Sequence, residues 1–155
     1  MPQTDDPLQR FLDAQSGSIP GCTDYSNALA EIEAGEKTTH WMWYIFPQIR
    51  GLGSSKFARL FAIRDLDEAN AYLAHPLLGF RILECCQAVL NISGKSAVGI
   101  FGKTDSMKLR SSMTLFEQAA GGDTSVFARV LEKYFDGKRD PLTLEILKAT
   151  QTKIP

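Results

Sequence analysis

The sequence contains few of the residues on which metal and thiol chemistry depend. It has only two histidines, His40 and His75, and no histidine or cysteine pairs at the spacing of a zinc site. Two of its three cysteines, Cys85 and Cys86, are adjacent, and α-carbons about 3.8 Å apart are too close for an ordinary disulfide. An odd number of cysteines without a regular framework is typical of a reducing compartment. We therefore expect no bound metal, no cofactor and a cytoplasmic location.

The sequence also lacks a long hydrophobic run and an excess of either charge. The longest unbroken apolar segment, 41–46, is far too short to span a bilayer, and the polar N-terminus shows no secretory signal. The 17 basic and 18 acidic residues give a net charge of -1, so no long-range field would attract a polyanion. These absences predict a protein without membrane or nucleic-acid partners, and they disfavour a DNA-binding helix-turn-helix protein.

The residues that are present suffice for one compact domain. Of the 155 residues, 44% are hydrophobic and 10% are aromatic, which is enough for one core and unlike a disordered chain. The sequence shows no internal repeat, low-complexity tract or domain linker. We expect a single helical domain over residues 1–155, with an ordered core at about 6–150.

Helix signals recur along the whole chain, and no segment alternates for long with the period of two that indicates a strand. We expect Asp6, Asp65 and Asp140 to cap three of the helices, and Thr104 or Asp105 to cap a fourth. Glycine or proline follows most of the helical segments and closes them. The pattern predicts an all-α fold, a compact array of about eight short helices without significant sheet.

The first candidate site is the aromatic segment 40–48. Both tryptophans, Trp41 and Trp43, lie in it, and the polar residues His40 and Gln48 bracket it. Aromatic walls with a few convergent polar groups hold planar ligands such as nucleobases. The alternative is a short buried helix at the centre of the core, because large aromatic side chains occupy cores far more often than pockets.

A glycine-rich turn follows and contains Gly51, Gly53, Ser55 and Lys56. A turn that enters a helix presents free N–H groups and the positive end of the helix dipole, which together favour an anion. The turn is not a Walker loop, since the Gly-Lys-Ser/Thr order is absent. The alternative is an ordinary turn in which the serine caps the next helix.

The third candidate segment is a predicted helix with basic and hydroxyl side chains. Asp105, Lys108 and Ser112 share one face of this helix, and Arg110 and Ser111 lie nearby. A lysine among hydroxyl groups can bind an anion, and a desolvated lysine can act as a base. The alternative is a capped helix with a solvated polar face and its apolar residues turned inward.

Several of these motifs resemble those of a known bacterial family. They include His-Trp-Met-Trp-Tyr-Ile-Phe-Pro-Gln at 40–48, Ala-Tyr-Leu-Ala-His-Pro-Leu-Leu-Gly at 71–79, and the helix at 105–116. The family is the one called domain of unknown function 1810, and the resemblance extends from about Leu8 to Leu147. It implies a small all-helical cytosolic protein, it implies no established activity, and it adds His75 to the candidate residues. Phe61 departs from the family pattern, which has a tyrosine there, and the connection 16–24 is longer than the family leads us to expect.

The candidate residues combine into one hypothesis about function. We expect the protein to bind or process a small nucleotide-like or anionic ligand in an aromatic pocket. The sequence names no reaction, so whether the protein is an enzyme stays open. The alternative is a non-enzymatic adaptor that binds protein partners and has no small-molecule site. The residues expected to line the pocket are His40, Trp41, Trp43, Gln48, Lys108, Arg110, Ser111 and Ser112.

Overall fold

The computed structural model describes residues 6–121 and 125–152, and within these ranges it confirms the all-α prediction. The one β-type contact there is an isolated parallel bridge between Ile49 and Ile63, so the described ranges contain no strand. None of the described helices is by itself long and apolar enough to cross a membrane, and the bent pair Leu66–Ala74 and Leu78–Asn91 passes that test only jointly. Ten helices lie within the described residues: α1 (Gln9–Gln15), α2 (Tyr25–Ala34), α3 (Met42–Ile45), α4 (Lys56–Leu60), α5 (Leu66–Ala74), α6 (Leu78–Asn91), α7 (Ala97–Phe101), α8 (Lys103–Ala120), α9 (Val126–Phe135) and α10 (Pro141–Thr152).

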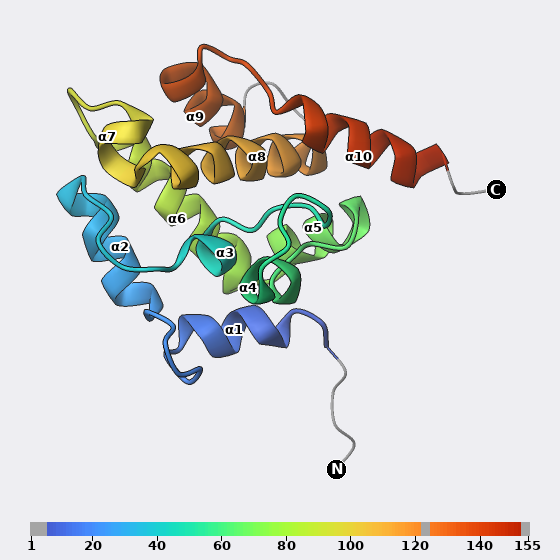
Figure 1. Cartoon of the computed structure of the whole chain (residues 1–155), viewed down its shortest axis with the longest axis horizontal. Coiled ribbons are helices and arrows are strands. Elements are labelled where there is room, and N and C mark those ends of the chain that lie inside the picture. The colour runs from blue at the N-terminus through green and yellow to red at the C-terminus, as the bar shows by residue number, and fades with distance from the viewer. Residues whose placement is uncertain (1–5, 122–124, 153–155) are drawn as a thin grey trace.

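The helix α8 organises the packing of the others. It contacts α9, α5, α7, α10 and α3. Figure 1 shows α8 running across the molecule, with α10 continuing past its end. The helix α1 lies on the opposite side of the molecule from α8. The short helix α3 contacts both α1 and α8, so it lies in the middle of the fold. The aromatic segment therefore meets α8 directly.

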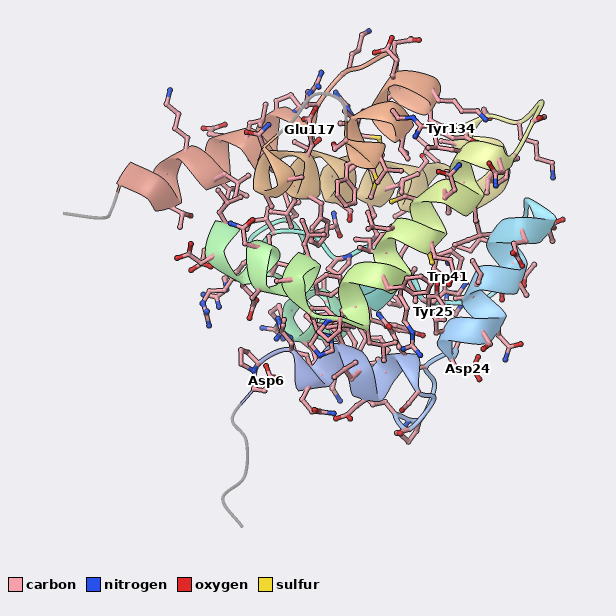
Figure 2. All side chains as sticks on the ribbon, turned by 180° about the vertical axis from the view of Figure 1, so that it is seen from behind. Asp6, Asp24, Tyr25, Trp41, Glu117 and Tyr134 are labelled. Carbon is pink, nitrogen blue, oxygen red and sulfur yellow. The ribbon has the colours of Figure 1, made fainter. Side chains whose placement is uncertain are left out.

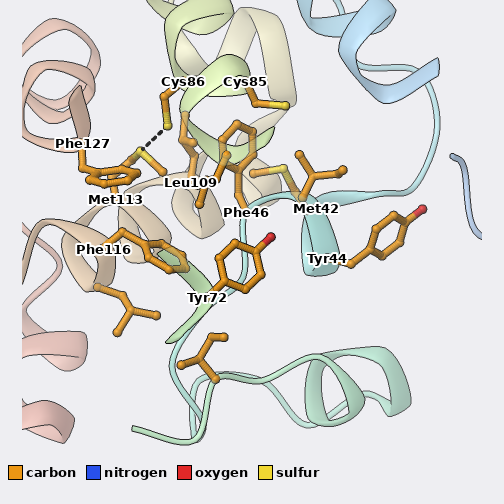
Figure 3. Close-up of a cluster of buried hydrophobic side chains, with 14 of the residues drawn as sticks. Met42, Tyr44, Phe46, Tyr72, Cys85, Cys86, Leu109, Met113, Phe116 and Phe127 are labelled. Carbon is orange, nitrogen blue, oxygen red and sulfur yellow. Dashed lines mark hydrogen bonds between the residues drawn. The ribbon is translucent and has the colours of Figure 1, made fainter. Parts of the chain in front are cut away.

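Aromatic side chains fill the centre of one hydrophobic cluster. Trp41, Tyr44, Phe46, Tyr72 and Phe116 are all fully buried there. Figure 3 shows Phe46, Tyr72 and Phe116 in this cluster. Aromatic rings bury large areas and prefer tilted or edge-to-face contacts, and the pair Tyr72 and Phe116, with ring centroids 5.3 Å apart, is tilted by 45°. The interpretation of the aromatic segment as part of the core is confirmed for Trp41, Tyr44 and Phe46.

The two adjacent cysteines of α6 belong to the same cluster. Cys85 and Cys86 are fully buried, and the Cys86 thiol lies 3.6 Å from the sulfur of Met113, as Figure 3 shows. Burial raises the pKa of Cys85 to about 12 and raises the pKa of Cys86 well above its ordinary value. Since the thiolate is the reactive form of cysteine, neither residue is a nucleophile at neutral pH. Both contribute to packing.

Local hydrogen bonds confirm several of the expected helix caps. The side chain of Asp65 accepts from the backbone N–H of Glu68 at 2.9 Å, and Asp140 accepts in the same way from Thr143 at 3.1 Å. The first helix begins later than predicted, because Asp6 accepts from the N–H of Leu8 and forms a turn before α1. In these positions a side-chain oxygen replaces the missing helical acceptor, which stabilises the end of the helix.

The expected cap of α8 is wrong. The helix begins at Lys103, so Thr104 and Asp105 lie inside its first turn. Gly102 is the N-cap residue, and its φ of 85° is in the left-handed region that favours glycine. No side chain caps α8 within the described residues, and its first N–H groups are therefore left for another partner. This difference matters for the candidate site.

Candidate functional site

Two adjoining cavities open between the segment 37–58 and α8, the helix that carries the basic stripe. The lysine cavity has a volume of about 330 Å³, and its main lining residues are Lys37, His40, Trp43, Lys103, Asp105 and Lys108. The Asp140 cavity has a volume of about 440 Å³, and its main lining residues are Trp43, Gln48, Leu52, Lys108, Ser111 and Asp140. Trp43, Thr104 and Lys108 line both cavities, so the two share a wall. Volumes of this order lie at the lower end of the range for small-molecule sites.

Lys108 stands at the junction of the two cavities. Its ammonium nitrogen lies 4.8 Å from the centre of the Trp43 ring and 3.3 Å from a carboxylate oxygen of Asp105. The Trp43 ring also packs edge-on against Phe57, with the ring centroids 5.3 Å apart. The cation–π contact and the ion pair together hold the charge of Lys108 between the aromatic segment and α8.

A second lysine reaches Asp105 from the segment that precedes the aromatic block. The Lys37 nitrogen lies 2.7 Å from the second carboxylate oxygen of Asp105, and it also donates to the backbone oxygen of Thr39 at 2.6 Å. Only 6% of the Lys37 side chain is exposed. The carboxylate of Asp105 therefore lies between two ammonium groups, and the three side chains together have a net positive charge.

The N-terminus of α8 adds to this positive charge. Gly102, Lys103 and Thr104 all line the lysine cavity, and α8 is 18 residues long. A helix of this length carries partial positive charge on its first N–H groups, and no side chain of the described residues caps them. The lysine cavity thus combines three lysines, one helix end and a single carboxylate, an arrangement that attracts an anion.

The Asp140 cavity has a different character. The Oδ2 atom of Asp140 accepts from the Ser111 hydroxyl at 3.1 Å and from the Thr143 hydroxyl at 2.5 Å. Gln48 contributes an amide, whereas Leu52 and Leu142 contribute apolar walls. The cavity therefore offers hydrogen-bond donors and acceptors beside a hydrophobic surface.

Gly53 allows the turn that borders the Asp140 cavity to approach α4 closely. A Cβ atom at position 53 would lie 2.7 Å from the Cβ of Ala58, which is too close for any side chain. Ser55 caps α4 by accepting from the N–H of Ala58 at 3.1 Å. Both residues line the cavity, but they do so as parts of a packed turn.

The structure brings together most of the residues that the sequence suggested. His40 and Asp105 line the lysine cavity, and Gln48 and Ser111 line the Asp140 cavity. Trp43 and Lys108 line both, as described above. The aromatic segment and the basic helix thus face each other, and that these residues bind a ligand stays a prediction.

Trp41 and Arg110 lie elsewhere and are removed from the candidate set. Trp41 is fully buried, and its indole N–H donates to the carboxylate of Glu31 at 2.8 Å. The guanidinium of Arg110 donates to the backbone oxygens of Lys138 and Arg139, at 2.9 and 2.8 Å. Trp41 therefore acts in the core, and Arg110 fastens the connection between α9 and α10 to α8.

Three further candidates also lie outside the two cavities. The Nδ1 atom of His75 accepts from the N–H groups of Leu77 and Leu78, at 3.1 and 3.2 Å, and so caps the start of α6. Gly51 adopts a φ of 105° in the turn, outside both cavities. Lys56 is exposed at the start of α4 and lines neither cavity. Of the four residues expected at this turn, only Gly53 and Ser55 therefore line a cavity, and an anion site there stays a prediction.

Ser112 is fully buried, and its hydroxyl has no hydrogen-bond partner within the described residues. Its neighbour Ser111 is also buried, but its hydroxyl bonds to Asp140. An unpaired buried hydroxyl costs free energy, and alanine is the better helix former. The adjacent serines therefore make opposite contributions to stability.

We predict that Ser112→Ala raises the free energy of unfolding by about 1 kcal/mol, whereas Ser111→Ala lowers it by about the same amount. Urea unfolding followed by circular dichroism measures both changes. A loss of more than about 1 kcal/mol in Ser112→Ala would show that the hydroxyl has a partner, such as a buried water molecule.

Sequence reasoning missed three charged residues of the site. Lys37 and Lys103 were not singled out, and Asp140 was interpreted only as a helix cap. A signal existed for the lysines, because each lies within three residues of a segment that was chosen, His40 in one case and Asp105 in the other. No local pattern indicated that Asp140 lies beside Ser111.

Comparisons with known proteins agree with the fold. The family model described as "Protein of unknown function (DUF1810)" matches residues 5–147. Among solved structures, the chain is similar to the conserved hypothetical protein Rv1873 from Mycobacterium tuberculosis, with a TM-score of 0.84 and 44% sequence identity. That match covers 91% of this chain and 96% of the other. No curated protein matches the chain significantly.

Proposed function

We propose that the chain, which belongs to the DUF1810 family of proteins of unknown function, binds a small anionic ligand of the nucleotide type in the cytosol. The position of Lys108 carries the proposal, because this residue lines both cavities and lies over the ring of Trp43. The anionic group occupies the lysine cavity, and the rest of the ligand, with its flat ring against the apolar wall, extends into the Asp140 cavity.

Electrostatics support the placement of the anion. The whole chain has a net charge of -1, yet Lys37, Lys103 and Lys108 gather around one cavity whose acidic lining residue is Asp105. Lys37 and Lys108 are already held by that carboxylate, so an entering anion meets ammonium groups that have lost much of their freedom. Preorganised charges bind more tightly because less entropy is lost on binding.

Apolar groups support the placement of the ring. Trp43 and Leu52 line the Asp140 cavity, together with Met107 and Leu142, each of which is 50% exposed. Large exposed apolar side chains beside a polar cavity are typical of a surface that a ligand covers. A flat ring that packs against this wall would remove it from water.

The test is a titration of the full chain with inorganic phosphate, AMP and ADP-ribose, followed by calorimetry and by thermal unfolding. We predict that Lys108→Met weakens the binding of AMP at least about tenfold, a loss of about 1.4 kcal/mol, since it removes the cation shared by both cavities. Lys56→Met is the matched control, because Lys56 is exposed and lines neither cavity. Its affinity should stay within about twofold of the wild type.

Two results would contradict the proposal. In the first, none of the three probes stabilises the fold at millimolar concentration, although a bound ligand must do so. In the second, Lys108→Met and Lys56→Met change the affinity equally. Urea unfolding of Lys108→Met confirms that the variant is folded before either result is read.

A protein-interaction role is the second candidate. Leu77, the N-cap residue of α6, is followed at three-residue spacing by Phe80 and Leu83, and the three are 41%, 61% and 47% exposed. An exposed apolar stripe is typical of a helix face that binds another protein. This role becomes the leading one if no anionic probe binds.

A further inference from the structure

The charged residues that line the two cavities differ. This difference indicates which part of the ligand each cavity accepts. Three lysines face one carboxylate in the lysine cavity. The charged residues that line the Asp140 cavity are one acid, Asp140, and one base, Lys108. A second anionic group in the Asp140 cavity would therefore meet a carboxylate, whereas an uncharged group would not be repelled.

We infer that the Asp140 cavity binds the hydroxyl groups of a sugar ring whose phosphate occupies the lysine cavity. The ligand is then a phosphate ester of a hydroxylated ring, such as the ribose phosphate part of a nucleotide. The inference rests on the proposed anion site, and it specifies which class of anionic ligand the site accepts.

Asp140 supplies the acceptor that a sugar hydroxyl needs. Its Oδ2 atom receives the hydrogen bonds from Ser111 and from both the backbone and the side chain of Thr143. Its Oδ1 atom accepts no hydrogen bond within the described residues. An ionised carboxylate has about four acceptor positions, so Oδ1 remains able to accept from a ligand. The three bonds to Oδ2 hold the carboxylate in place, which lowers the entropy lost on binding.

The neighbours of Asp140 complete a set of groups suited to a hydroxylated ring. The Gln48 amide is half-buried in the cavity and can both donate to and accept from a hydroxyl. Lys108 adds donors at the junction, where the phosphate and the ring are joined. Trp43 provides an apolar surface for the face of the ring that carries C–H groups.

The test compares ribose 5-phosphate, 2-deoxyribose 5-phosphate and inorganic phosphate on the full chain by calorimetry. We predict that ribose 5-phosphate binds at least about tenfold more tightly than either of the others, because a site with paired polar groups rejects an analogue that leaves them unpaired. The deoxy sugar differs from the ribose ester by one hydroxyl group. Comparing the two sugar phosphates therefore measures the contribution of that hydroxyl separately from the contribution of the phosphate.

Asp140→Asn is the informative variant. Asparagine caps a helix about as well as aspartate, so the start of α10 is preserved while the charge and one acceptor oxygen are removed. We expect this variant to bind all three probes within about threefold of one another and to bind inorganic phosphate at least as well as the wild type. Asp24→Asn is the matched control, since Asp24 caps α2 in the same way and lines neither cavity. It should keep the wild-type preference.

A second variant, Gln48→Ala, keeps the test independent of the cap on α10. It should also weaken the binding of ribose 5-phosphate more than the binding of inorganic phosphate.

Equal binding of the three probes to the wild type would overturn the inference and leave the anion site standing. A preference for ribose 5-phosphate that survives in Asp140→Asn would overturn the assignment to Asp140. The absence of any binding would remove the proposed function together with the inference.

Discussion

Replacing Trp41 by alanine is expected to lower the free energy of unfolding by about 4 kcal/mol, the cost of removing a large aromatic side chain from a core. The indole is fully buried and packs against Phe46 and Phe101, each with its ring centroid 6.2 Å away. Figure 2 labels Trp41 among the side chains seen from behind. The cavity left by the alanine variant cannot close without moving these rings. Urea unfolding monitored by far-ultraviolet circular dichroism measures the loss.

Two further variants separate packing from hydrogen bonding and from ligand binding. Trp41→Phe keeps most of the ring but loses the bond to the Glu31 carboxylate, so about 2 kcal/mol should be lost. Trp43→Ala should cost less than Trp41→Ala, because Trp43 is half-buried and lines the cavities, but it should weaken the binding of AMP. If Trp41→Ala costs no more than Trp43→Ala, Trp41 does not occupy the core position described above.

The all-helical fold could be predicted because its signals are local. A cap such as Asp65 needs a partner only three residues away, and a helix face repeats every three or four residues. The start of α8 escaped prediction because it depends on Gly102, whose backbone turns directly from α7 into α8. That turn depends on how the two helices pack, and local patterns do not contain this information.

The two interpretations of the aromatic segment divide between its two tryptophans, and ligand binding by the second one stays a prediction. Trp41 lies in the core, and Trp43, two positions later, lines the cavities. The side to which each indole points depends on the packing of α3 against α1 and α8. These contacts join residues far apart in the chain, so the periodicity of a four-residue helix could not separate the two tryptophans.

The adjacent serines of α8 also show that a local sequence pattern cannot separate two neighbouring residues. Ser111 lines the Asp140 cavity, whereas Ser112 is enclosed without a partner. Neighbours on a helix point about 100° apart, and one step therefore separates the site from the interior. The sequence placed both serines near a common face, but only the position of α10, which brings Asp140 to Ser111, distinguishes them.

A second large effect is expected at Glu31, which ties α2 to the segment before the aromatic block. Its carboxylate accepts from the indole of Trp41 at 2.8 Å and from the hydroxyl of Thr39 at 2.5 Å, and the N–H groups of Thr38 and Thr39 also donate to it. Burial by itself would raise the pKa of Glu31, but these hydrogen bonds outweigh it and lower the pKa from 4.5 to about 2. A carboxyl whose pKa falls on folding stabilises the folded state above its unfolded pKa. This contribution is lost as the pH falls from about 4.5 to about 2.

We predict that Glu31→Gln lowers the free energy of unfolding by about 2 kcal/mol at pH 7, because a neutral amide accepts more weakly than a carboxylate and adds donors that meet other donors. The difference between wild type and variant should shrink below pH 4.5 and become small near pH 2, where about half of the wild-type carboxyl is protonated in the folded state. Urea unfolding at a series of pH values measures it, with Glu36→Gln, an exposed residue two positions after the end of α2, as the control. A constant difference across this range would mean that the charge of Glu31 does not hold the segment.

Because Lys37 and His40 lie on that segment, a loosened segment would also weaken the binding of AMP, whereas a purely local effect on α2 would leave the affinity unchanged.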